Sequence, residues 1–148
     1  MRWIIAGTVV FLLGTITVAN AGEDATKEDK SDMVEWKKLE GTWIVVAAKM
    51  EGAKGVSRLK NAKIIVTADD MWLKLEDWNE NEWVMLYKID SSQKPKHIDF
   101  SDGYKTKKGI YDLDGDDLKF CVALVDERPV EFSDKGQLLL ILKRKKTR

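Results

Sequence analysis

The chain has very few of the side chains on which most enzymes and metal sites depend. Its 148 residues include one histidine, one cysteine and two prolines. The single cysteine, Cys121, excludes a disulfide within the chain, and the single histidine, His97, excludes a histidine-rich metal site. Any catalytic triad would have to be built around His97. We therefore expect no enzymatic activity, no bound metal and no cofactor, and we expect stability to come from an apolar core.

Net charge is also missing, because 25 Lys and Arg residues balance 25 Asp and Glu residues. A balanced chain has no overall field that would gather nucleic acid, so we expect no nucleic-acid partner. The exception is the C-terminal stretch 143–148, KRKKTR, which carries five bases. This tail is either a solvated chain end or a contact for anionic lipid, a wall polymer or nucleic acid.

Residues 3–19 include no charged residue, and Arg2 gives the segment a positive start. The segment ends at 19–21 with Ala-Asn-Ala, in which two small residues flank a third, as at a signal-peptidase cleavage site. A positive start, an uncharged apolar stretch and such an end are typical of an export signal. Residues 1–21 are therefore predicted to be a cleaved signal peptide, which makes the protein periplasmic or extracellular. The alternative is an uncleaved N-terminal membrane anchor, since this stretch is close to the shortest that spans a bilayer.

Residues 22–30, GEDATKEDK, contain almost no apolar side chains, and we expect them to form a disordered spacer. The folded domain is expected to cover 31–146 and to begin with a helix of about two turns. Ser31 suits its N-cap and Gly41 its end. Its apolar stripe consists of residues at a spacing of three, which are Met33, Trp36 and Leu39.

After Gly41 the hydrophobic period falls to two, and β-branched and aromatic residues dominate, as is typical of strands. Turn-forming clusters separate the apolar runs, and the clearest is Asp114-Gly115, a dipeptide that favours a two-residue hairpin. Short antiparallel strands at nearly regular spacing indicate a barrel or a sandwich. The pattern predicts strands at 42–50, 62–67, 71–76, 82–89, 97–101, 107–113, 117–125 and 137–144.

Gly41-Thr42-Trp43, at the start of the first predicted strand, is similar to the lipocalin signature. In that signature the tryptophan closes one end of an eight-stranded barrel, and a basic residue from the last strand stacks across it. Arg144 occupies the corresponding place at the end of LLLILKR. The resemblance implies that Trp43 and Arg144 form a barrel-closing pair through a cation–π contact.

Six sequence blocks, in order, resemble a family of exported lipocalin-like domains of unknown function that is abundant in planctomycete bacteria. They are LEGTW at 39–43, KPKHID at 94–99, GIYDLDGD at 109–116, LKFC at 118–121, RPVEF at 128–132 and LKR at 142–144. The resemblance implies an all-β fold, an eight-stranded antiparallel lipocalin-like barrel with a short N-terminal helix. Because the activity of that family is itself unknown, the resemblance leaves the function open.

A barrel of eight strands is either filled by its own side chains or just wide enough for one small ligand. The first hypothesis is therefore a non-catalytic binding module for a small apolar or amphipathic molecule. Its expected interior consists of Trp43, Val45, Ala47, Ile64, Val66, Met85, Tyr87, Phe100, Tyr111 and Phe120. The alternative is a barrel with a solid core that acts as a protein-interaction or cell-envelope structural module.

Three tryptophans, Trp72, Trp78 and Trp83, depart from the family pattern. They either rim a barrel mouth, form a protein contact, or pack the outer wall against the N-terminal helix. Cys121 is either a small buried hydrophobe or a free thiol that reacts or bridges to another chain.

The acidic run 112–117, DLDGDD, does not match a calcium loop. Counted from Asp112, the sixth position is Asp117 rather than Gly, and the twelfth is Ala123 rather than Glu. We therefore interpret the run as a hairpin without a metal. Strand alternation places His97 on a polar face, where it is expected to face solvent or anchor a turn.

Overall fold

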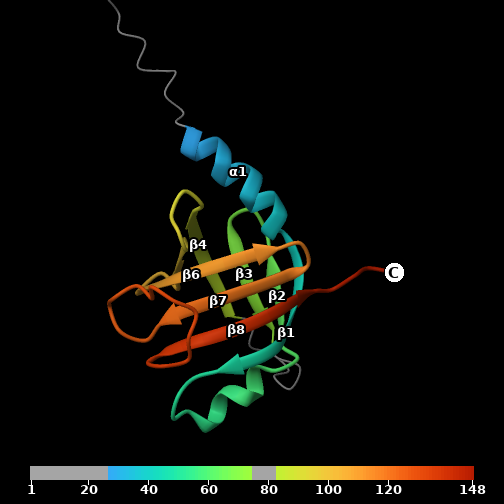
Figure 1. Cartoon of the computed structure of the whole chain (residues 1–148). Helices are drawn as coiled ribbons and strands as arrows, with labels where there is room; N and C mark the ends of the chain where they lie inside the picture. The colour runs from blue at the N-terminus through green and yellow to red at the C-terminus, as the bar shows by residue number, and fades with distance from the viewer. Residues whose placement is uncertain (1–26, 75–82) are drawn as a thin grey trace, which may run out of the picture.

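The computed structural model describes residues 27–74 and 83–148, and in this part of the chain eight antiparallel strands form a closed barrel (Figure 1). Each strand pairs with the next along the chain, and β8 pairs back onto β1. The predicted all-β, eight-stranded fold is therefore confirmed. The strands are β1 (Gly41–Lys49), β2 (Lys63–Val66), β3 (Asp70–Lys74), β4 (Trp83–Asp90), β5 (Lys96–Ser101), β6 (Thr106–Asp114), β7 (Asp117–Ala123) and β8 (Gln137–Arg144).

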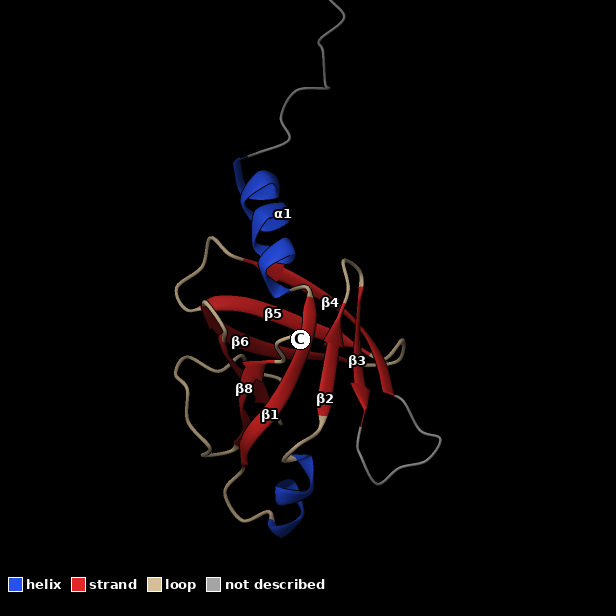
Figure 2. Ribbon diagram, turned by 90° about the vertical axis from the view of Figure 1, so that its right-hand side faces the viewer, coloured by secondary structure: helices blue, strands red, loops and turns tan. Residues whose placement is uncertain are grey.

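In the described part of the chain, one α-helix, α1 (Lys27–Leu39), stands on one end of the barrel, and a short 3₁₀ helix, η1 (Lys54–Leu59), lies at the opposite end (Figure 2). The short N-terminal helix is thus present, but it begins before Ser31, so the predicted N-cap is wrong. The Ser31 hydroxyl instead lies 3.1 Å from that of Ser91. No helix within the described residues has the length and apolar content needed to cross a membrane.

The extra turn of α1 takes in residues 27–30, which were expected to belong to the disordered spacer. Lys and Glu propagate a helix well, so a charged sequence next to an anchored helical turn extends it. The predicted apolar stripe is only partly correct. Trp36 and Leu39 pack on the barrel core, whereas Met33 is 55% exposed. The predicted signal peptide, 1–21, and residues 22–26 of the spacer lie outside the described residues.

Polar contacts fix α1 to the turn between β4 and β5. The carboxylate of Asp32 accepts hydrogen bonds from the backbone N–H of Ser91, at 2.8 Å, and from its hydroxyl, at 2.5 Å. Glu35 is buried and forms an ion pair with Lys96 of β5. The helix is therefore held by the barrel rim as well as by the chain that connects it to β1.

The hairpin between β6 and β7 forms where the sequence predicted it, with a shift of one residue. Asp114 pairs with Asp117, so the two loop residues are Gly115 and Asp116. Gly115 has a φ of 59°, which fits a tight hairpin turn with glycine at its first central position.

The long connection between β7 and β8, residues 124–136, covers part of the outer wall. Ile110 and Cys121 face outward by register, since their neighbours Tyr111 and Phe120 lie in the core, yet both are fully buried. Arg128 reaches back from this connection and donates to the carbonyl of Gly109 at 2.7 Å. The outer face of β6 and β7 is thus a second apolar layer.

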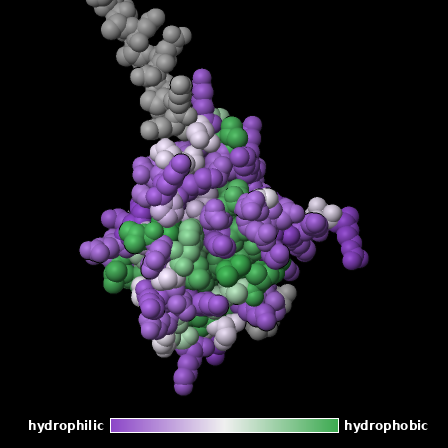
Figure 3. Space-filling model, viewed as in Figure 1, coloured by the Kyte–Doolittle hydropathy of each residue, from purple (hydrophilic) through white to green (hydrophobic). Residues whose placement is uncertain are grey.

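Elsewhere the outer wall stays open. The outward faces of β2, β3 and β4 carry Ile65, Trp72 and Val84 in one cross-strand row, and Val84 is 43% exposed. Leu86 is 57% exposed, so α1, although it contacts β4, leaves the outward face of this strand open at Val84 and Leu86. Figure 3 shows a different face, on which β6, β7 and β8 lie in front, and there too apolar residues gather below the mainly polar α1. Trp78 and the side chain of Trp83 lie outside the described part of the chain.

Gly109 supplies a test of this two-layer packing. A Cβ at this position would lie 2.9 Å from the carbonyl oxygen of Cys121 and 3.3 Å from Cγ2 of Ile98. We expect Gly109→Ala to lower the free energy of unfolding by about 1–3 kcal/mol, measured by urea denaturation, because backbone must move to relieve the overlap. Gly55→Ala is the matched control, since nothing lies within 4 Å of its Cβ. Equal effects of the two substitutions would contradict the close approach at Gly109.

Candidate functional site

The barrel end beneath α1 is closed by Trp43 and Arg144. Trp43 is fully buried, and its indole N–H donates to the carbonyl of Leu39 at 2.8 Å. The guanidinium carbon of Arg144 lies 4.2 Å from the centre of the indole ring. The two residues are also direct partners in the pairing of β1 with β8. The structure therefore brings together the pair that the lipocalin resemblance implied, in the stacked geometry of a cation–π contact.

Arg144 also holds the C-terminal end of α1. Its Nη1 donates to the carbonyl of Glu40 at 2.8 Å, and its Nη2 donates to that of Lys38 at 2.5 Å. These carbonyls have no partner inside the helix, and a cation is favourable at a helix C-terminus. Gly41 makes room for the arrangement, because a Cβ there would lie 2.9 Å from Nη1 of Arg144.

Two tyrosines complete the closed end. The hydroxyl of Tyr87 donates to the carbonyl of Thr67 at 2.6 Å, and burial raises the pKa of Tyr87 to about 12. Burial, with nearby Glu35, also raises the pKa of Tyr111, whose ring lies 5.8 Å from the ammonium of Lys96. This end of the barrel is thus filled by side chains.

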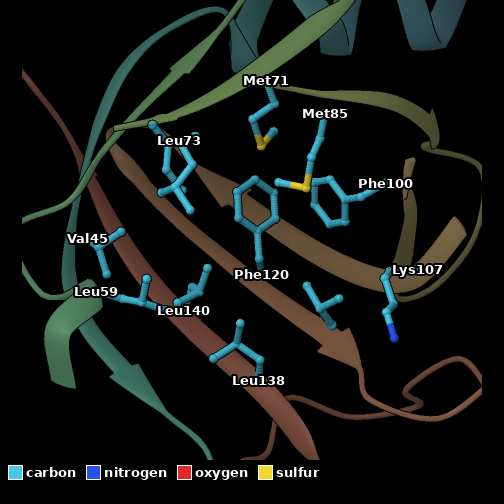
Figure 4. Close-up of a pocket in the computed structure, with 12 residues that line it drawn as sticks. Val45, Leu59, Met71, Leu73, Met85, Phe100, Lys107, Phe120, Leu138 and Leu140 are labelled. Carbon is cyan, nitrogen blue, oxygen red and sulfur yellow. The ribbon is translucent and has the colours of Figure 1, made fainter. Parts of the chain in front are cut away.

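The opposite half of the barrel contains a cavity of about 210 Å³, whose surface is entirely apolar (Figure 4). It lies toward the end of the barrel where η1 contributes Leu59 and the start of β8 contributes Leu138. Met71, Met85, Phe100 and Phe120 point into the same space, and the rings of Phe100 and Phe120 meet edge to face with centroids 5.7 Å apart. The lining comprises Val45, Leu59, Ile64, Met71, Leu73, Met85, Phe100, Lys107, Phe120, Val122, Leu138 and Leu140.

The expected interior residues divide between the two ends. Those that line the cavity are Val45, Ile64, Met85, Phe100 and Phe120. Those that are buried in the core without lining it are Trp43, Val66, Tyr87 and Tyr111.

Ala47 belongs to neither group, and its placement in the interior is wrong. The pairing of β1 with β8 shifts register between Val45 and Ala47, where β1 carries a bulge. Beyond the bulge Ala48 pairs with Leu140, an inward-facing residue, and packs against the core. One extra residue therefore exchanges the two faces of the strand, which alternation alone could not show.

Several cavity residues were missed by the sequence reasoning for identifiable reasons. In β8 the run LLLIL places apolar residues on both faces of the strand, so alternation could not show which face points inward. Leu138 and Leu140 were therefore left out of the expected interior. Leu59 comes from η1, which has no strand period. Lys107 is charged, and charge is normally a sign of an outward position.

Other candidate residues lie outside this cavity. Cys121 is buried in the outer layer, where its thiol donates to the carbonyl of Ser133 at 3.3 Å and burial raises its pKa. His97 is half-buried on the outer face of β5, and burial together with Arg128 lowers its pKa. Within residues 27–74 and 83–148, no cluster of three or more metal-ligating side chains occurs.

Comparisons of the chain with protein-family models, with curated proteins and with solved structures find no match.

The contact between Trp43 and Arg144 can be measured with a double-mutant cycle. We expect Trp43→Ala to lower the free energy of unfolding by about 3–5 kcal/mol, as for other buried aromatic residues. The coupling energy between Trp43→Ala and Arg144→Ala should be about 0.5–2 kcal/mol, measured by urea denaturation of the two single variants and the double variant. A cycle with Arg58→Ala, which lies at the other end of the barrel, should show no coupling. Additive effects of the Trp43 and Arg144 substitutions would show that the stacking contributes nothing.

The raised pKa of Tyr87 predicts how the free energy of unfolding changes at alkaline pH. Its pKa is 10.0 in a model compound and about 12 in the folded protein, so the unfolded chain releases the proton first as pH rises. The stabilisation from the neutral phenol is complete below pH 10 and is lost between pH 10 and 12. The urea midpoint should therefore fall across this window, and less steeply in Tyr87→Phe. Tyr104→Phe, at a side chain that is 96% exposed, should keep the wild-type slope, and a Tyr87→Phe slope equal to wild type would refute the assignment.

Proposed function

We propose that this protein is a non-catalytic binding module that holds one small apolar or amphipathic molecule in the cavity of its barrel. The observation that carries the proposal is the cavity of about 210 Å³, which the described residues line with an entirely apolar surface. A void of this kind excludes water and loses dispersion contacts, so an apolar occupant is favourable.

The volume limits the size of the ligand. At about 30 Å³ for each water-sized unit, the cavity accommodates roughly seven non-hydrogen atoms. This is smaller than the usual pocket for a drug-sized molecule, which is about 300 Å³ or more. The ligand is therefore a short chain or a single ring.

The closed end determines the direction of access. Trp43, Arg144 and the paired Glu35 and Lys96 fill the end beneath α1, so the ligand enters from the end that carries η1. We also infer from the N-terminal sequence that the chain is exported, which places this binding step outside the cytoplasm.

The first test is native mass spectrometry of the protein purified from its own host without refolding. We expect a reproducible extra mass that is lost on denaturation, and chemical identification of that mass would name the ligand. A clean apo mass, together with the failure of 1-octanol to bind, would overturn the proposal. That result would favour the alternative, an interaction module that uses the exposed outer wall around Val84 and Leu86.

A variant that fills the cavity provides the second test. Seven buried methylene-sized groups at about 0.8 kcal/mol each give about 5.6 kcal/mol, so 1-octanol should bind with a Kd on the order of 0.1 mM by calorimetry. Val122→Phe adds a ring to the cavity lining and should abolish binding while leaving the barrel folded by circular dichroism. Leu124→Phe, at a neighbouring side chain that is 46% exposed, is the matched control and should bind as wild type. Equal 1-octanol affinity in Val122→Phe and wild type would place the binding site elsewhere.

A further inference from the structure

A lysine, Lys107, lies on the inward face of β6 at the cavity. It pairs with Phe100 of β5, and its inward neighbours along the same strand are Gly109 and Tyr111. The other lining residues are all apolar. A charged side chain on the inner wall of a barrel is uncommon, because burial of an unpaired ammonium is costly.

The position of Lys107 avoids burial of its ammonium. The cavity surface contains no polar atom, so the methylenes of Lys107 form part of the wall and its ammonium lies beyond it. Figure 4 shows the nitrogen directed away from the other labelled side chains. The residue is exposed as a whole, and long cationic side chains commonly bury the stem and keep the charged head in water. The ammonium therefore lies at the mouth of an apolar cavity.

A second inward-facing lysine, Lys96, has a carboxylate partner within the protein. Lys96 pairs with Tyr111 on the inner face of β5 at the closed end, where it is neutralised by the buried carboxylate of Glu35. Among the ion pairs formed within residues 27–74 and 83–148, none involves Lys107. The neighbouring lysines Lys105 and Lys108 are also exposed, but each lies beside a carboxylate, Asp102 for Lys105 and the cross-strand Asp99 for Lys108.

We propose that the ligand is a single-chain amphiphile with an anionic head, whose tail of about seven carbons fills the cavity and whose head pairs with the ammonium of Lys107. This inference rests on the proposed binding function and specifies its ligand class. The apolar wall selects the tail, and the ammonium at the mouth selects the sign of the head and fixes its position at the solvent boundary.

The test compares two probes of equal chain length, octanoate and 1-octanol, by calorimetry on the full chain and its variants. The ratio of the 1-octanol Kd to the octanoate Kd measures the preference for the anionic head. We expect this ratio to be about two- to fivefold higher in wild type than in Lys107→Gln, as for an exposed charge pair. Lys108→Gln, on the outward face of the same strand, should keep the wild-type ratio. The preference for octanoate should also decrease as the salt concentration is raised, because salt screens an exposed charge pair.

Charge reversal separates this inference from a loss of fold. Relative to its affinity for 1-octanol, Lys107→Glu should bind octanoate more weakly than wild type does and octylammonium more tightly, a gain that a misfolded variant cannot produce. Suppose that 1-octanol binds wild type, but the ratio of the 1-octanol Kd to the octanoate Kd is the same in wild type, Lys107→Gln and Lys107→Glu. The proposed anionic ligand class is then wrong, and the binding function stands. If neither probe binds, the binding function itself is wrong.

Discussion

The contact of Arg144 with Trp43 is the constraint on which the arrangement of this barrel depends. It joins the last strand to the first at the point where the barrel closes. The same guanidinium satisfies two carbonyls at the end of α1, and its Nε lies 3.3 Å from Asp116 in the β6–β7 turn. One side chain thus connects barrel closure, the helix and a hairpin. Gly41 is required beside it because any larger residue would occupy the space of the guanidinium.

This closure makes the two ends of the barrel physically different. Beneath α1, Trp43 donates to the backbone carbonyl of Leu39, and the buried carboxylate of Glu35 forms an ion pair with Lys96. Around the cavity the side chains are apolar and contact a void. The polar contacts that close the barrel therefore lie at the closed end, and unfilled volume at the cavity end does not disturb them. Such a separation suits a binding module, because changes to the lining alter the ligand more than the fold.

The sequence predicted the elements well because strand period, turn residues and glycine positions are local signals. The closed barrel end at Trp43 was implied only by the resemblance to the lipocalin signature, whereas clean alternation in β2, β5 and β7 predicted much of the interior. Sequence reasoning failed where the decisive interaction is not local. The bulge before Ala47 depends on the pairing with β8, and the start of α1 depends on anchoring by Asp32 and Glu35.

The candidate site was harder to predict than the fold for the same reason. A cavity is the volume that side chains from many strands do not fill, and no single residue encodes it. Leu59 and Lys107 show the difficulty, since one lies outside the strand pattern and the other contradicts it.

The contradiction at Lys107 is informative, because local rules are broken mainly where function requires it. Lys96 breaks the same rule on the neighbouring strand, and there the structure supplies a buried carboxylate from α1. The closed end thus carries its own counter-ion, which fixes the helix in place. At the open end, no ion pair formed within residues 27–74 and 83–148 involves Lys107, and its ammonium is the group that we propose attracts an anionic ligand. The two inward lysines therefore differ in their surroundings: Lys96 is paired and holds α1 to the barrel, whereas Lys107 is the residue that we propose selects the ligand.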